Sequence, residues 1–228
     1  ETALEHYRWL GDLLGQANVL NSLGPVRVMT GDNRQAMRDF EQARDLFREL
    51  GYRQGHASAL TSLGAARLRV GDHEGAIEDL LKSLELLQEL AYRQGRANAL
   101  ALLGAARCLS GDVPSAFQNL EQALALFREL GSRDGEAFAL NHYAAVFGST
   151  GDYARALRLY RDALRLARDV EMPDEQAHAL EGIGECLLSA GDVPGGIDHL
   201  NQATDIYKRL GMADLERVEE RLAALDPL

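Results

Sequence analysis

The sequence predicts an all-α solenoid, an array of antiparallel helix pairs stacked on one another. One observation is a repeated phrase: Leu63–Arg67 returns forty residues later as Leu103–Arg107. A second is a Gly-Asp pair that recurs at the same interval, at Gly31-Asp32, Gly71-Asp72, Gly111-Asp112, Gly151-Asp152 and Gly191-Asp192. Periods of about 20 to 50 residues build stacked arrays, because one repeat alone cannot bury its apolar face. We therefore expect a single continuous domain over residues 1–228.

Each period predicts two helices joined by the Gly-Asp pair. Residues 54–70 and 73–90 both carry small and apolar side chains at helical spacing. Gly71 tolerates the left-handed backbone that ends the first helix, and the Asp72 carboxylate accepts from the open N–H groups that begin the second. We expect the second helix of an incomplete repeat, five full pairs and a lone capping helix, at residues 1–10, 11–50, 51–90, 91–130, 131–170, 171–210 and 211–228.

Small residues stand where the two helices of a pair must approach, and large residues stand at the matching positions. The small ones on the first helices are Gly24, Gly64, Gly104, Ala144 and Gly184. The large ones on the second helices are Phe40, Leu80, Leu120, Tyr160 and Leu200. This ordered set resembles the tetratricopeptide repeat, and the resemblance covers nearly the whole chain. It implies a right-handed superhelical solenoid of antiparallel helix pairs.

Two departures from the family pattern make the chain resemble one subgroup of the family more closely than the others. The period is 40 residues instead of about 34, and Arg27, Arg67 and Arg107 stand where an aromatic residue is usual. With the Tyr-Arg-Gln-Gly links at residues 52–55 and 92–95, the pattern is similar to arrays appended to actinobacterial signal-transduction ATPases and antibiotic-type transcriptional regulators. That resemblance implies the sensor or interaction segment of a larger cytoplasmic regulatory protein. The alternative is a stand-alone scaffold or a signalling-peptide receptor.

Composition argues against several functions. The net charge of −11 disfavours direct nucleic-acid or anionic-lipid binding, and no apolar run is long enough for a membrane span. Cys108 and Cys186 lie two repeats apart, which indicates a reducing compartment. Neither a phosphate-binding glycine loop nor a nucleophile elbow or zinc-protease signature occurs. We expect no catalysis, no cofactor and no metal.

In this family the first helices line a concave groove, so the resemblance implies that a protein or extended peptide binds there. The side chains one stripe around from the buried face form the expected partner-binding groove: Asn18, Asn21, Ser58, Thr61, Arg69, Asn98, Phe138, Asn141, His142, His178, Glu181 and Glu185. An Asn amide offers both a donor and an acceptor and therefore suits a peptide group. Arg69 is expected to meet an acidic group, and Glu181 and Glu185 a basic one. That these residues are only solvated helix surface stays open.

Two other hypotheses concern a group of polar side chains around His178 and the proline at position 25. His178, Glu181 and Glu185 share one helix face and, beside His142, form the alternative of a metal or pH-sensing site. Pro25 is expected to kink its helix and to free a backbone carbonyl.

Two further expectations concern the arginines and the N-terminal end. Arg27, Arg67 and Arg107 are expected to lie along the seam between repeats and to pair with acidic neighbours, with a phosphate-binding ladder as the alternative. Trp9 and Leu10 are expected to lack a packing neighbour, which allows self-association through the truncated N-terminal end.

Overall fold

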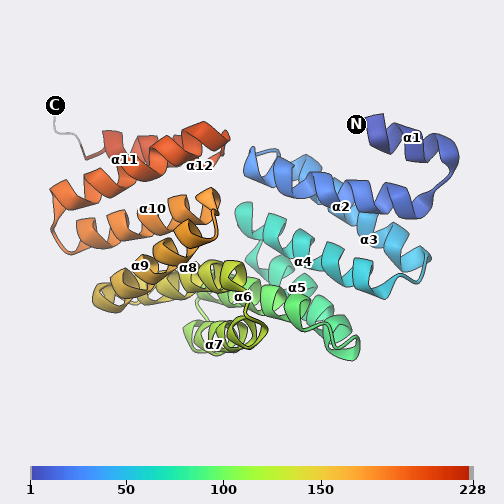
Figure 1. Cartoon of the computed structure of the whole chain (residues 1–228), viewed down its shortest axis with the longest axis horizontal. Coiled ribbons are helices and arrows are strands. Elements are labelled where there is room, and N and C mark those ends of the chain that lie inside the picture. Colours follow the sequence, from blue (N-terminus) through green and yellow to red (C-terminus); the bar gives the residue numbers. More distant parts are fainter. Residues whose placement is uncertain (1, 226–228) are drawn as a thin grey trace. The chain divides into compact units, whose positions relative to one another are not determined.

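The structure is a computed structural model that describes residues 2–225, and in that part of the chain it contains helices and no strand (Figure 1). A short helix, α1 (Thr2–Leu10), comes first. There follow, in chain order, α2 (Leu13–Met29), α3 (Asn33–Glu49), α4 (Arg53–Arg69), α5 (His73–Glu89), α6 (Arg93–Leu109), α7 (Val113–Leu130), α8 (Arg133–Ser149), α9 (Tyr153–Asp169), α10 (Pro173–Ser189) and α11 (Val193–Leu210). The first and second helices of a repeat pack as a pair in α2 and α3, α4 and α5, α8 and α9, and α10 and α11. The last helix is α12 (Asp214–Ala223). The predicted all-α array of helix pairs is confirmed; residues 1 and 226–228 of its terminal elements lie outside the described part.

The helices form two compact units, Glu1–Gly111 and Asp112–Leu228. In the first unit, the first helices α2, α4 and α6 contact one another in order, and α3 and α5 pack against them (Figure 1). In the second unit, α8 contacts α10, while α9 and α11 pack against these first helices. Stacking of equivalent helices is the arrangement that the period predicts. That one continuous domain spans both units stays a prediction.

The predicted helix ends are confirmed. Asp72 begins α5, and its carboxylate accepts from the Gly75 N–H at 3.0 Å. The equivalent caps, at 3.1–3.4 Å, are Asp32, Asp112, Asp152 and Asp192. Gly71 has φ +81°, the left-handed backbone that the turn requires. Each cap stabilises its helix by about 1 kcal/mol.

The close approach of the two helices within a pair is also confirmed. A Cβ on Gly64 would lie 2.7 Å from the Leu80 Cγ, and one on Gly24 would overlap the Phe40 ring. Leu80 and Phe40 are both buried. A larger first-helix residue at these positions would force α4 from α5, or α2 from α3.

Arg27 and Arg67 pair with acidic neighbours, as expected, and each partner lies in the same repeat. Arg27 pairs with Asp39, and Arg67 pairs with Asp79 at 3.1 Å. Both carboxylates are buried, and burial raises the pKa of Asp79 while Arg67 opposes the shift. Each guanidinium therefore joins a first helix to the second helix of the same repeat. Because Arg27 and Arg67 are bound to these carboxylates, they do not form the alternative phosphate-binding ladder.

Two further observations concern the predicted kink at Pro25 and the predicted absence of a membrane span. α2 continues through Pro25 from Leu13 to Met29 as one helix. None of the described helices combines the length and the apolar character that crossing a bilayer requires.

Candidate partner-binding face

The side chains expected to bind a partner lie on the first helices, and we call this surface the first-helix face. In the first unit it contains a row of equivalent positions, Asn18 on α2, Ser58 on α4 and Asn98 on α6. Asn18 and Ser58 are exposed, and Asn98 is half-buried. Within residues 2–225, the side-chain amides of Asn18 and Asn98 have no hydrogen-bond partner. Two amides with open donors and acceptors therefore lie on this row.

The neighbouring row of the same face is used for packing. The Asn21 Nδ2 donates to the Ser58 Oγ at 3.4 Å and so bridges α2 and α4. The Thr61 hydroxyl donates to the Ala57 carbonyl at 3.1 Å and lies 2.8 Å from the Ser83 Oγ on α5. These two side chains hold helices together, contrary to the expectation that they are open to a peptide. Arg69 is exposed at the end of α4.

In the second unit, Asn141 lies inside the array, whereas the sequence placed it on the open face. It is 6% exposed, and its Nδ2 donates to the Glu175 carbonyl at 3.0 Å and to the Glu175 Oε2 at 2.7 Å. Glu175 is itself buried at the start of α10, and burial raises its pKa against the opposing effects of His178 and Asn141. Asn141 therefore joins α8 to α10, and its amide nitrogen is already bound within the chain.

The aromatic members of the predicted set pack in pairs. The Phe138 and His142 rings meet edge to face with centroids 4.6 Å apart on α8. His178 lies against Tyr207 of α11 with centroids 5.8 Å apart. Burial, followed by the charge of His178, lowers the pKa of His142 to about 4. His142 is therefore a neutral, half-buried ring at neutral pH.

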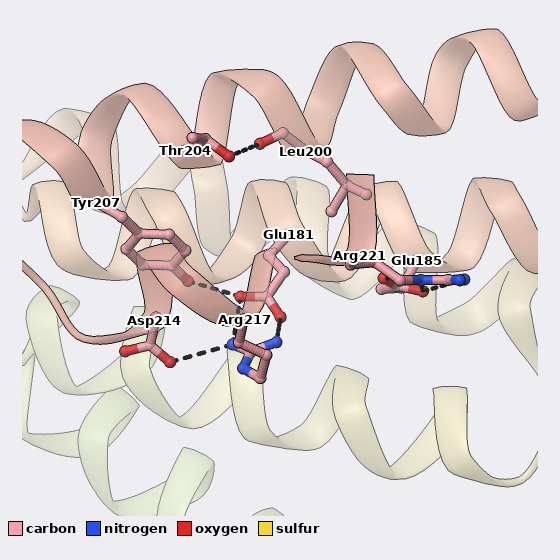
Figure 2. A network of polar contacts seen from close by, with 8 residues as sticks. All are labelled: Glu181, Glu185, Leu200, Thr204, Tyr207, Asp214, Arg217 and Arg221. Carbon is pink, nitrogen blue, oxygen red and sulfur yellow. Dashed lines mark hydrogen bonds and ion pairs between the residues drawn. The ribbon is translucent and has the colours of Figure 1, made fainter. Parts of the chain in front are cut away.

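The two predicted carboxylates of α10 are bound by the last helix of the chain (Figure 2). The Arg217 Nη1 donates to the Glu181 Oε1 at 2.5 Å and its Nη2 to the Oε2 at 3.0 Å. The Tyr207 hydroxyl donates to the same Oε2 at 2.8 Å. One turn on, Arg221 donates to both Glu185 oxygens, at 3.0 and 3.1 Å. The basic groups that bind Glu181 and Glu185 therefore come from α12 of the same chain, whereas the sequence predicted a basic group of a partner.

This network also bears on the metal alternative. Both carboxylates of the His178, Glu181 and Glu185 stripe accept from guanidinium groups. Among the residues that the structure describes, no three His, Cys, Asp or Glu side chains are placed to hold a metal ion. The sequence predicted a lone capping helix in residues 211–228 but did not indicate Arg217 and Arg221 as partners of these carboxylates. A signal existed, because Arg217 and Arg221 repeat the four-residue spacing of the two glutamates.

The comparisons with known proteins agree with this architecture. The family model described as Tetratricopeptide repeat matches residues 55–129, 95–169 and 135–209, which together cover more than half of the chain. The chain belongs to the tetratricopeptide repeat family. No curated protein matches it.

Solved structures show the same fold at low sequence identity. BtubC (BKLC) from P. vanneervenii is 18% identical with a TM-score of 0.67, covering 100% of this chain and 91% of that one. A Rap protein complexed with Competence and Sporulation Factor is 18% identical with a TM-score of 0.68, covering 98% and 70%. The Rap conjugation gene regulator of plasmid pLS20, in complex with a Phr peptide, is 14% identical with a TM-score of 0.77. That match covers 94% of this chain but only 58% of the regulator's length.

Proposed function

We propose that this chain is a non-catalytic repeat domain that binds a protein or an extended peptide on its first-helix face. The observation that carries the proposal is the row on α2, α4 and α6. Its members are polar, at equivalent places on three stacked helices, and two of them keep their side-chain amides uncommitted within the described residues. The proposed contact residues are Asn18, Ser58 and Asn98, with Arg69 at the C-terminal end of α4.

The spacing of the helices suits an extended chain. Neighbouring helices pack about 8–10 Å apart, and an extended peptide advances about 3.3 Å per residue. One helix of the row would therefore meet about every third residue of the ligand. Asn18 and Asn98 would each donate to a peptide carbonyl and accept from a peptide N–H.

Two of the similar structures support a ligand of this kind. One is a Rap protein with Competence and Sporulation Factor, and the other is a conjugation gene regulator with a Phr peptide. We propose that this domain serves as the sensor or interaction segment of a larger regulatory protein. A stand-alone scaffold or signalling-peptide receptor is the second candidate, and the two Rap complexes favour it. Sequencing the complete gene separates the candidates, since the first requires an effector domain in the same chain.

A peptide selected on the protein itself tests the binding proposal. Random peptides displayed on phage would be selected against the whole chain, and the best binder would be measured by fluorescence anisotropy. The face variant is Asn18→Ala with Asn98→Ala, and the control variant is Gln42→Ala with Gln88→Ala. Gln42 and Gln88 are exposed on the second helices α3 and α5.

We expect the face variant to bind at least about fivefold more weakly, because two hydrogen bonds are worth roughly 0.5–1.5 kcal/mol each. The control variant should bind as the parent does. Equal affinities for all three proteins would overturn the assignment of this face. Matched thermal melts of the variants establish that both retain the fold.

A further inference from the structure

The second helix α9 has a charge balance opposite to that of the other second helices. It carries five arginines and two aspartates, a net charge of +3 within a protein of net charge −11. The basic and acidic residues of the other second helices number four and four in α3, one and five in α5, one and two in α7, and two and two in α11. None of these four helices has a net positive charge.

The reversal comes from particular repeat positions. Arg161 occupies the place that the other second helices give to Glu41, Leu81, Glu121 and Asn201. Arg165 occupies the place of Asp45, Glu85, Ala125 and Asp205. A structural need common to all repeats would place the same charge at each of them. Arg161 and Arg165 are therefore specific to α9, whereas the place of Arg168 is also basic in Arg48, Arg128 and Lys208.

Four of the arginines form one exposed stripe. Residues spaced by three and four positions share a helix face, and all four side chains are exposed: Arg158, Arg161, Arg165 and Arg168. Arg165 pairs with Asp162 at 3.3 Å. Within residues 2–225, the side chains of the other three form no ion pair or hydrogen bond. Three guanidinium groups thus face solvent on one helix with their charge uncompensated by a direct contact.

The stripe borders a hollow in the surface. This hollow has a volume of about 310 Å³ and is lined by Arg161, Leu164, Arg165, Arg168 and Asp169. Leu164 is 8% exposed and contributes an apolar wall. Arg133 of α8 pairs with the Asp169 carboxylate at 2.6 Å. The negative charge of Asp169 is therefore compensated by a residue of the same chain. The hollow is therefore lined by one apolar side chain, three arginines and one aspartate that is already paired.

We propose that the α9 stripe binds an acidic segment of a partner protein. Each guanidinium presents parallel N–H donors that match a carboxylate. From Arg158 to Arg168 the stripe spans about 15 Å at 1.5 Å per residue, the length of four or five extended residues. The negative charge elsewhere on the chain is screened beyond about 8–10 Å at physiological ionic strength, so the stripe dominates locally. This surface lies on a second helix and does not depend on the first-helix face.

A labelled octaglutamate peptide tests this proposal. Its affinity for the whole chain would be measured by fluorescence anisotropy in low and in physiological salt. The stripe variant is Arg158→Gln with Arg161→Gln and Arg168→Gln. The control variant is Arg34→Gln with Arg38→Gln and Arg48→Gln, which changes the net charge equally at three exposed arginines of α3.

We expect the stripe variant to bind about tenfold more weakly in physiological salt, since exposed charge pairs each contribute modestly. The control should change affinity by less than about twofold. An equal loss in both variants, or no binding to the parent, overturns the proposal. So does tighter binding of an oligothymidylate of equal charge, which would assign the stripe to nucleic acid. Both variants remove only exposed side chains, and thermal melts check that they fold.

Discussion

Two helix ends in this chain are closed by residues that carry a side chain where the backbone is left-handed. Ala91 ends α5 with φ +50°, and Glu171 ends α9 with φ +57°. The equivalent position elsewhere is occupied by Gly51, Gly131 and Gly211. A non-glycine residue in this conformation costs roughly 1–2 kcal/mol. These two positions therefore hold local strain that the other repeats avoid.

Replacing Ala91 by Gly is expected to stabilise the protein by about 0.5–1 kcal/mol, because the strain is relieved but the unfolded chain gains freedom. Ala91 is exposed, so no packing is lost. Urea denaturation followed by circular dichroism measures the change. Gly51→Ala is the mirror variant and should destabilise by about 1 kcal/mol. If Ala91→Gly is neutral or destabilising, the strain is not real.

His142 makes stability depend on pH. Its pKa is lowered from 6.5 to about 4 in the folded chain. Between these values the unfolded chain binds more protons, so stability is full above pH 6.5 and falls as the pH drops toward 4. The parent should lose about 1–3 kcal/mol more than His142→Gln over this window, as measured by urea denaturation. Parallel pH profiles of the two proteins would refute this role.

At the scale of the element, α12 stands where the next first helix would lie and is tied to α10 by two guanidinium-carboxylate pairs (Figure 2). The Glu181 side chain is 14% exposed, so its pair with Arg217 is better shielded than an ordinary surface pair. The Arg217 pair with Asp214 at 3.1 Å adds a link within α12. We interpret these pairs as the attachment that keeps the last helix on the array.

Removing the attachment should loosen α12 without unfolding the other helices. For Arg217→Gln with Arg221→Gln, we expect amide hydrogen exchange in α12 to rise about tenfold, since two such pairs contribute about 1–2 kcal/mol to local stability. Hydrogen-exchange mass spectrometry resolves this helix from the rest. The variant Lys208→Gln with Arg209→Gln, on the neighbouring α11, matches its charge change. Equal exchange in the two variants would show that the ion pairs do not hold α12.

The repeat made the elements predictable. Gly-Asp pairs located the turns, and small residues such as Gly64 located the close contacts of α4 with α5. Local chemistry determines both features, so one sequence was enough. The partners of the polar side chains were not predictable, because they depend on how far one helix is rotated against the next. Asn141 was placed on the open face for this reason, although it lies buried against Glu175.

At the scale of the whole molecule, the chain combines one repeated fold with two distinct polar surfaces. The first-helix face carries uncommitted amides at equivalent repeat positions, and α9 differs from α3, α5, α7 and α11 in its net positive charge. Equivalent positions suit a ligand that extends along several repeats. A single exceptional helix suits a local contact. Two partners, or two parts of one partner, could thus be held by separate sets of residues.

The central claim is that a peptide binds across the first helices. Hydrogen-exchange mass spectrometry of the whole chain, with and without the selected peptide at saturation, tests it most directly. We predict slower exchange in α2, α4 and α6, with α3 and α5 unchanged, because the ligand would contact Asn18, Ser58 and Asn98. Protection confined to second helices, including α9, would contradict the claim that the first-helix face is the binding surface.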